Sequence, residues 1–189
     1  KKLVFGPATE APDVADNVLY DGQVADHAVN SIRELASSEE PFFLAVGFIK
    51  PHSPYIAPKR YWDLYDPNTI PIAADETKGI APIELHGSGE LRRYTDQPKR
   101  GEISEANQRQ VRHAYLSCVS YIDAQIGRVL AELREQDLEE NTIVVLWSDH
   151  GYHLGEKGLW GKTTNFERDT RVPLIIRAPG LAAGATSEA

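Results

Sequence analysis

The chain has 189 residues, of which 41% are hydrophobic and 25% charged, as in an ordinary globular fold. This composition argues against bulk disorder and against a coiled coil, and no stretch approaches the roughly 20 apolar residues of a membrane span. The 20 basic and 28 acidic residues give a net charge of −8, which argues against a nucleic-acid-binding protein. An anionic substrate would be repelled at long range, so it would require cations placed locally.

The sequence begins Lys-Lys and contains no Met, so we expect a processed chain or a piece of a larger protein. After a loop-like start, apolar residues recur at spacings of three and four from about Asp21 to Ser37, which predicts an amphipathic helix. A continuous apolar run follows from Phe42 to Ile49 and stops at Pro51. Its length and aromatic content predict a strand that is buried on both faces.

Between Pro51 and Gly101 the hydrophobic pattern dissolves, and seven prolines fall in this region. Its one periodic piece, around Lys59 to Leu64, is short. We therefore predict a long irregular excursion over residues 51–101. Long loops inside compact domains are uncommon and often functional, so this excursion is a candidate wall of a substrate site.

The clearest predicted helix follows, with Ser104 or Asn107 as its cap and an end near Gln136. Its apolar stripe includes the single cysteine, Cys118, which indicates a buried structural thiol. Two further strands are predicted, from Thr142 to Trp147 and from Val172 to Ile176 or Arg177. The order of helices and strands predicts an α/β fold with a largely parallel central sheet and flanking helices.

Ligands of open α/β sheets bind beyond the carboxyl ends of the strands, and two of the predicted strands end in polar residues. One is followed by Asp149-His150, which pairs a hard oxygen ligand with an imidazole. Adjacent residues of an extended chain point to opposite faces, so both reach one ion only if the backbone bends, as Gly151 allows. The alternative interpretation is a turn in which Asp149 caps the backbone and His150 is exposed.

The other predicted strand is followed by Lys50-Pro51-His52. His52 is either a general acid or part of a solvated strand end, and Lys162 is either an anion contact or a surface lysine. His153 follows His150 by three residues, a spacing of helical metal ligands, but the segment is loop-like, so His153 is a minor candidate for a substrate contact. From His150 to Arg177 five basic and three acidic residues give +2, which is compatible with an anion site. The other histidines, His27, His86 and His113, are given structural roles, with His113 on the polar side of its helix.

Three stretches resemble the sulfatase family, and within it the iduronate sulfatase branch and its bacterial relatives. They are PFFLAVGFIKPHSPY, SYIDAQIGRVL and TIVVLWSDHGYHLGEKGLWGKTTNFERDTRVPLIIRAPG. The matching motifs extend from about residue 40 to 180 and are weakest between about 75 and 101. The resemblance implies an alkaline-phosphatase-like α/β fold and hydrolysis of sulfate esters, with sulfated sugars or glycosaminoglycan-like molecules as substrates. Family members are commonly exported or lysosomal.

The same resemblance implies a divalent cation, usually calcium, and a formylglycine nucleophile made from cysteine. Carried over by motif, Asp149 and His150 would be metal ligands, Lys162 would contact the sulfate, and His52 would bind the sulfate or protonate the leaving alcohol. A cation and two donors aimed at the transferring group would offset its charge. His153 is a weaker candidate for substrate contact.

The chain departs from the family pattern because the nucleophile motif is absent: Cys118 is followed by Val119-Ser120-Tyr121. The opening pair of aspartates that completes the family's calcium site is absent as well, as are a lysine and a histidine of the first half. We therefore expect residues 1–189 to be the middle-to-late part of a sulfatase catalytic domain, inactive alone, with formylglycine outside this segment. A phosphodiesterase or phosphonate hydrolase of the same superfamily, and a non-catalytic relative, are the alternatives.

Overall fold

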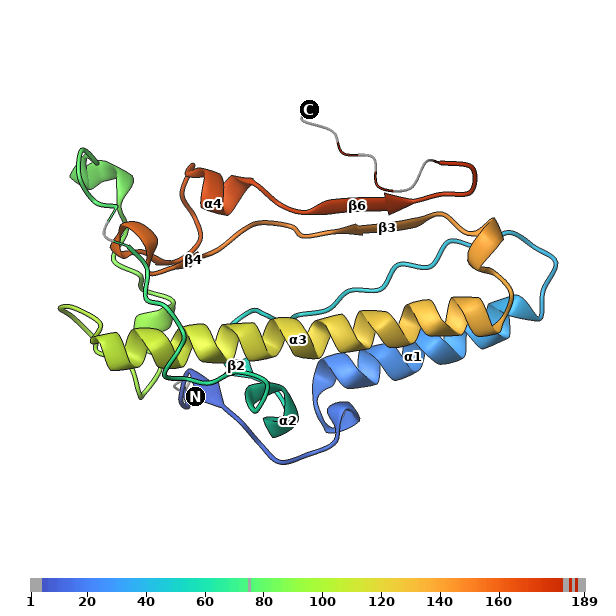
Figure 1. Ribbon diagram of the computed structural model, residues 1–189, viewed down its shortest axis with the longest axis horizontal. Helices are drawn as coiled ribbons and strands as arrows, with labels where there is room; N and C mark the ends of the chain where they lie inside the picture. The colour runs from blue at the N-terminus through green and yellow to red at the C-terminus, as the bar shows by residue number, and fades with distance from the viewer. Residues whose placement is uncertain (1–4, 75, 182–183, 185, 187–189) are drawn as a thin grey trace, which may run out of the picture.

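The computed structural model describes residues 5–74, 76–181, 184 and 186. Two long helices form one layer, and a two-stranded ribbon forms a second layer above them (Figure 1). The helices are α1 (Tyr20–Ala36) and α3 (Glu105–Glu135), and the strands of the ribbon are β3 (Val144–Trp147) and β6 (Leu174–Arg177). An extended segment, residues 41–49, runs between the two layers (Figure 1).

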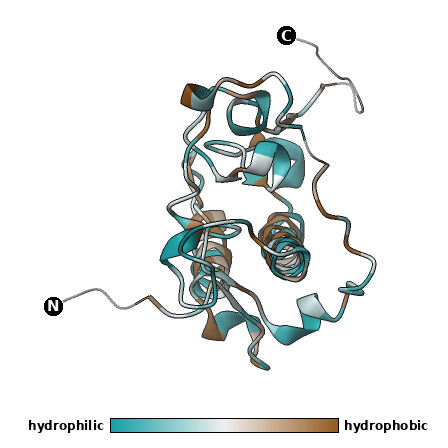
Figure 2. Cartoon of the chain, turned by 90° about the vertical axis from the view of Figure 1, so that its left-hand side faces the viewer, coloured by the Kyte–Doolittle hydropathy of each residue, from teal (hydrophilic) through white to brown (hydrophobic). Residues whose placement is uncertain are grey.

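The helical layer confirms both helix predictions. Ser104 caps α3, since its Oγ accepts a hydrogen bond from the backbone N–H of Asn107 at 3.3 Å. Ile32 of α1 is buried, and so are Val111, Cys118, Ile122 and Leu133 of the apolar stripe of α3. Figure 2 looks at the helices end-on, with hydrophobic residues in brown. Cys118 lies in this core, and burial raises the pKa of its thiol to about 12, as predicted for a structural cysteine.

The remaining elements are short. They are β1 (Thr9–Glu10), β2 (Tyr55–Ile56), α2 (Lys59–Trp62), β4 (His153–Leu154), β5 (Trp160–Gly161) and α4 (Glu167–Thr170). Single 3₁₀ turns lie at Asp16–Val18, Pro82–Glu84, Leu91–Arg93, Glu139–Asn141 and Glu156–Gly158. No helix among the described residues is both long and apolar enough to cross a membrane.

The predicted large parallel sheet is not present in the described residues. Three separate pairs form instead: β1 with β2 in parallel, and β3 with β6 and β4 with β5 in antiparallel register. A parallel pair needs a crossover, usually a helix, but the chain from β3 to β6 holds only a small hairpin and the four-residue α4, so it reverses direction. The run Phe42–Ile49 is extended but joins no strand ladder within the described ranges, so its assignment as a buried strand is wrong.

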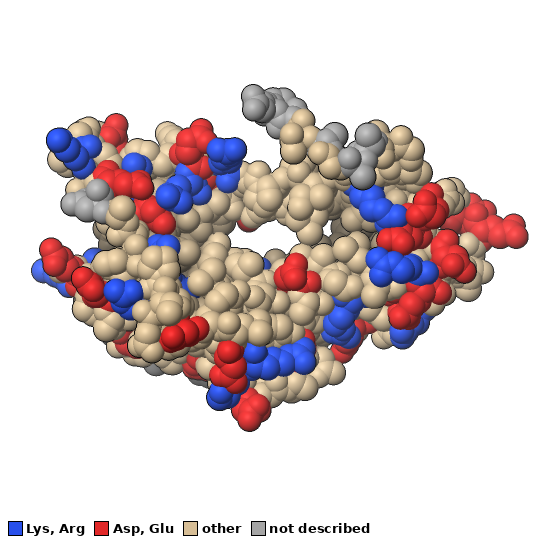
Figure 3. Space-filling model, viewed as in Figure 1, with Lys and Arg blue, Asp and Glu red and all other residues tan. Residues whose placement is uncertain are grey.

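Large apolar side chains of the ribbon and of the extended segment face solvent. Phe43 is 92% exposed and Trp147 66%, and the side chains of Leu174 and Ile175 are exposed as well. Figure 3 shows an opening through the molecule between the ribbon and the helical layer. Apolar area in contact with water at adjacent strands marks a surface that fits another layer of protein.

The described residues of the excursion 51–101 form only short helices and the two-residue β2, and they are not detached from the core. Tyr55, Leu91 and Tyr94 join the core with α3. His113 of α3 is buried rather than on a polar face, because its Nε2 lies 2.9 Å from the carbonyl oxygen of Trp62 in α2. The predicted position of His113 on the polar side of its helix is therefore wrong, because α2 covers that face of α3.

Candidate active site

His52 and Lys162, which are 110 residues apart in sequence, meet at one end of the molecule. The Lys162 Nζ lies 3.0 Å from the His52 Nε2. Lys162 is 18% exposed, so its ammonium is partly shielded, and it also lies 5.7 Å from the centroid of the Tyr152 ring. The structure thus brings together the two residues that the sequence marked as candidate donors to an anion.

The neighbours of His52 fix which ring nitrogen carries the proton. Its Nδ1 lies 2.7 Å from the carbonyl oxygen of Ser53, and a carbonyl only accepts, so Nδ1 donates. In the neutral ring Nε2 then holds the lone pair and accepts from the Lys162 ammonium. The reactive nitrogen therefore faces the cation, and the other nitrogen is held by the backbone.

A carboxylate that the sequence reasoning missed completes this group. Glu90 lies 3.4 Å from the His52 Nε2 and 3.3 Å from the Lys162 Nζ, and it accepts a 3.0 Å hydrogen bond from the Ser53 hydroxyl. Burial alone would raise the pKa of Glu90, but the hydrogen bond from Ser53 and the charge of Lys162 lower it below its ordinary value. Glu90 is therefore ionised at neutral pH.

The turn that carries His52 is anchored from two sides. The carboxylate of Asp21, in the first turn of α1, accepts the backbone N–H groups of Ile49 and Lys50 at 2.8 and 3.0 Å. The Lys50 ammonium in turn donates to the carbonyl oxygens of His52, at 2.9 Å, and of Pro54. Burial lowers the pKa of Lys50. The Lys50 ammonium is thus used in hydrogen bonds to the backbone of the turn and is not a free cation.

Lys162 follows directly on the β4–β5 hairpin, in a stretch of constrained backbone. Gly161 has a φ of +131° and Thr163 has a φ of +83°, a conformation that is costly for a residue with a Cβ. The excursion holds this hairpin, because the Ser88 hydroxyl accepts the backbone N–H of Trp160 at 2.9 Å. The position of Lys162 therefore depends on residues far away in the sequence.

Asp149 and His150 follow β3 and also converge. The His150 Nε2 lies 3.6 Å from an Asp149 carboxylate oxygen, and the His150 Nδ1 lies 2.7 Å from the carbonyl oxygen of Gly151, to which it donates. Nε2 is then free to act as a ligand, in the arrangement usual for metal-binding histidines. The Asp149 side chain is 84% exposed. An oxygen and a nitrogen ligand thus face one point, which fits half of a divalent cation site.

The two residues do not make a full metal site. Among the described residues no group of three or more His, Cys, Asp and Glu side chains could hold an ion. Calcium takes six to eight mainly oxygen ligands. Within the same described ranges, no hydrogen bond or ion pair joins Asp149 and His150 to the pair of His52 and Lys162.

Gly151 has a different role from the bend inferred from the sequence. A Cβ at this position would lie 1.8 Å from the carbonyl oxygen of Arg168, and the Gly151 N–H donates to the carbonyl oxygen of Asp169 at 2.8 Å. The backbone of α4 therefore packs directly on Gly151. A glycine is required because of this close approach.

His153, the weakest of the predicted substrate contacts, is completely buried. Its Nδ1 lies 2.8 Å from Asp169, whose other carboxylate oxygen accepts the backbone N–H and the hydroxyl of Thr164 at 2.7 and 2.6 Å. These bonds close the loop around Lys162. The burial favours a supporting role for His153, and its contact with substrate stays a prediction.

The local excess of cations seen in the sequence is largely compensated in three dimensions. Four of the five basic residues between His150 and Arg177 lie within 4 Å of a carboxylate. The partners are Glu76 for Lys157 and Arg168, Glu90 for Lys162, and Glu139 and Glu140 for Arg177. An anion is therefore met by a few oriented groups and not by a broad positive field.

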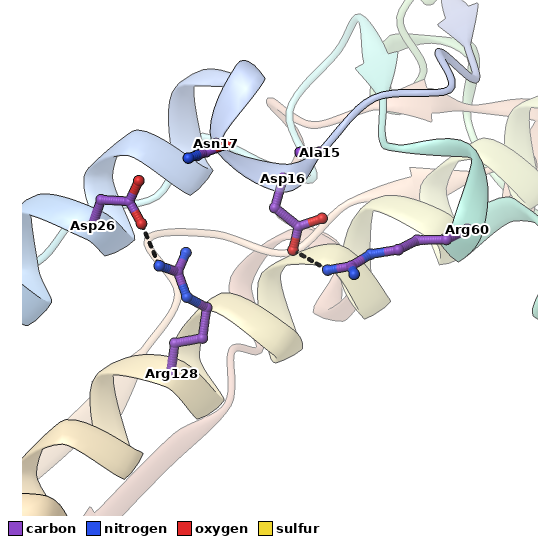
Figure 4. A pocket seen from close by; sticks show the side chains of 6 residues that line it. All are labelled: Ala15, Asp16, Asn17, Asp26, Arg60 and Arg128. Atoms are coloured by element: carbon purple, nitrogen blue, oxygen red, sulfur yellow. Dashed lines mark hydrogen bonds and ion pairs between the residues drawn. The ribbon is translucent and has the colours of Figure 1, made fainter.

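A hollow of about 280 Å³ between α1, α2 and α3 is a weaker candidate for a ligand site. Figure 4 shows that its charged side chains are directed at one another. Arg60 pairs with Asp16, and Arg128 pairs with Asp26. Because each cation already has its anion, this hollow offers no uncompensated charge to a ligand.

Comparison with known proteins agrees with the resemblance inferred from the motifs. A family model described as Sulfatase matches residues 7–189. Iduronate 2-sulfatase of Mus musculus is 37% identical over 182 residues, which are 92% of this chain and 33% of that protein. Choline-sulfatase of Rhizobium meliloti (strain 1021) is 32% identical over 177 residues, 91% of this chain and 34% of its own.

Among solved structures, the phosphonate monoester hydrolase SpPMH from Silicibacter pomeroyi superposes with a TM-score of 0.74 at 26% identity, covering 96% of this chain and 38% of its own. The chain spans about a third of the length of the curated relatives it matches. Its short sheets and long helices are therefore part of the alkaline-phosphatase-like architecture of sulfatases and phosphonate hydrolases. By the family match over residues 7–189, the chain belongs to the sulfatase family.

Proposed function

We propose that this chain is the middle-to-late part of a catalytic domain that hydrolyses sulfate esters, and that the remainder of the domain completes its active site. The observation that carries the proposal is the contact of the His52 Nε2 with the Lys162 Nζ at 3.0 Å. An ammonium and an imidazole from distant segments, brought together in irregular loops, are what an anionic group needs in order to be held and oriented.

Lys162 and His52 have separate roles in this proposal. The Lys162 ammonium donates to non-bridging sulfate oxygens, where negative charge is concentrated. Protonated His52 donates its Nε2 proton to the bridging oxygen as the bond from sulfur to that oxygen breaks and sulfur bonds to a nucleophile outside this segment, so the product leaves as an alcohol and the ring becomes neutral. The bond from Nδ1 to the Ser53 carbonyl keeps the ring in the orientation that this transfer requires.

Asp149 and His150 are proposed as ligands of a divalent cation, with calcium as the family expectation. When bound, such a cation offsets charge on the sulfate oxygens. The 3.6 Å separation of the His150 Nε2 from the Asp149 carboxylate, and the backbone bond of the His150 Nδ1, support the pair as ligands. Formylglycine is expected outside this segment, so we propose that the 189 residues are inactive alone and bind calcium weakly.

A sulfated sugar or glycosaminoglycan-like ester is the proposed substrate. The similarity to a protein named iduronate 2-sulfatase, at 37% identity, supports this class. The excursion of residues 51–101 brings Glu90 and Ser88 to the site, which supports its role as one wall. Specificity in such folds resides in loops of this kind.

A second candidate is hydrolysis of phosphonate monoesters or of phosphate diesters. The superposition on a phosphonate monoester hydrolase over 96% of this chain favours it specifically. The same donor pair would serve either anion, because sulfate and phosphonate groups are both tetrahedral and present negatively charged oxygens.

The test is turnover by the full-length protein that contains this chain, assayed with calcium on aryl and sugar sulfate esters and on an aryl phosphonate monoester. We expect faster turnover of sulfate esters. Substitution Lys162→Ala or His52→Ala is expected to lower kcat/KM about 10²- to 10⁴-fold. Lys78→Ala, an exposed lysine of the excursion, is the matched control. Unchanged turnover in both site variants would refute the assignment, and preference for the phosphonate would favour the second candidate.

A further inference from the structure

We infer that Glu90 is a positioning residue that holds His52 and Lys162 together as a pair, an inference that rests on the proposed function and deepens it. The carboxylate contacts both groups, at 3.4 Å from the His52 Nε2 and 3.3 Å from the Lys162 Nζ. A negative side chain in the middle of an anion site opposes substrate binding, so its presence calls for a different contribution.

That contribution is to permit two cationic groups at close range. The Lys162 ammonium and a protonated His52 would repel each other at 3.0 Å, and this repulsion would drive the two side chains apart. A carboxylate within reach of both offsets this repulsion and fixes their geometry. Glu90 thereby allows His52 to carry the proton it is proposed to give to the leaving group.

Glu90 is itself held rigidly. The Ser53 hydroxyl donates to it at 3.0 Å, so the residue after His52 also positions the carboxylate. Its neighbours in sequence, Ser88 and Leu91, are almost fully buried, and the Ser88 hydroxyl is bonded to the backbone of Trp160. The segment that carries Glu90 is therefore bonded, through Ser88, to the hairpin that precedes Lys162. A functional pair requires support of this kind.

A direct role for Glu90 in holding a substrate hydroxyl is the competing interpretation, and kinetics separate the two. A positioning residue acts on the chemical step, so its loss lowers kcat. A binding residue acts on KM. Loss of the negative charge also has a signature of its own: inorganic sulfate, the product, is expected to bind more tightly as kcat falls.

The experiment compares the full-length protein with its Glu90→Gln, Glu90→Asp and Glu84→Gln variants. Gln keeps the size and the bond from Ser53 but removes the charge, Asp keeps the charge, and Glu84 is an exposed glutamate of the same excursion. For Glu90→Gln we expect kcat to fall about 10- to 100-fold and the inhibition constant of sulfate to fall about 3- to 10-fold. Glu90→Asp is expected to recover part of kcat, and Glu84→Gln to match the wild type.

The inference is overturned if Glu90→Gln leaves kcat within twofold of the wild type, if only KM rises, or if sulfate binding weakens together with kcat. Thermal melting of each variant shows whether the protein is folded. If the wild-type protein turns over no ester at all, the proposed function is refuted separately from the role of Glu90. That role is then tested by measuring the binding of sulfate to the wild type and to Glu90→Gln by calorimetry. Tighter binding by the Glu90→Gln variant would then support the role of Glu90, and unchanged or weaker binding would overturn it.

Discussion

The helical layer and the ribbon differ in what they bury, although the ribbon is the more apolar of the two in sequence. Along α3 the side chains of Val111, Ala114 and Cys118 have no exposed surface, whereas Trp147 and Leu174, which pair across the ribbon, are largely exposed. The helical layer buries its own apolar side chains. The ribbon has the composition of a core strand without a core around it, which agrees with a chain that spans a third of its relatives.

The difference shows that the hydrophobic pattern of a sequence reflects the surroundings of each element in the complete fold. A part of that fold supplies only some of those surroundings. Helices bury one face against a neighbour, and α1 and α3 supply that neighbour to each other. Strands buried on both faces need two further layers. The described elements therefore leave the apolar surface of the ribbon exposed, whereas α1 and α3 cover each other.

The largest expected effect contrasts one residue from each region. Ile32→Ala removes a buried side chain between α1 and α3 and should lower the free energy of unfolding by about 2–5 kcal/mol. Leu174→Ala in the ribbon should change it by less than about 0.5 kcal/mol in the 189-residue chain. Urea denaturation followed by circular dichroism measures both. Equal losses would show that the ribbon is buried in solution and would break the contrast.

The junction between the ribbon and the site provides a second test. In Gly151→Ala the added methyl would collide with the carbonyl oxygen of Arg168, so α4 must move, at a cost of about 1–3 kcal/mol. We expect faster amide hydrogen exchange between residues 149 and 171 and unchanged exchange in α1 and α3. Faster exchange throughout the helices would instead mean that the two regions unfold as one unit.

The smallest expected effect concerns the loop around Lys162. Burial alone would raise the pKa of Asp169, but the bonds from Thr164 and His153 lower it below its ordinary value of 3.8. A depressed carboxyl pKa stabilises the fold above the unfolded value and loses that contribution as the pH falls through the folded one. Asp169→Asn should therefore cost on the order of 1 kcal/mol at pH 5 and less at pH 3. The difference in melting temperature between wild type and variant measures this, and a pH-independent difference would contradict it.

Much of the local structure could be predicted from sequence. The apolar spacing of α1 and α3 sets their helices, and Ser104 marks where α3 begins. The candidate site residues were recognisable mainly from the resemblance of their motifs to those of sulfatases, and for His52, Asp149 and His150 also because they follow apolar runs. The parallel sheet could not be predicted correctly, since pairing depends on which strands are present. Phe42–Ile49 has strand composition but meets no strand among the described residues.

Residues that act through others left little trace in the sequence. Glu90 lies in a stretch without periodicity, and its contacts with His52 and Lys162 join positions 38 and 72 residues away. The buried pair of His153 and Asp169 joins positions 16 residues apart. One signal was present: a proline-rich excursion of this length inside a compact fold indicates function. This signal indicated the segment 51–101 but did not single out Glu90 within it.

The buried thiol of Cys118 has a practical consequence. It is the only cysteine of the sequence, and burial raises its pKa to about 12, so almost none of it is thiolate at neutral pH. Thiol reagents should therefore react very slowly with the native chain. A cysteine introduced on the ribbon, at Ile175 for instance, would be the sole reactive position, and its labelling rate with a maleimide dye would report how far that surface is covered.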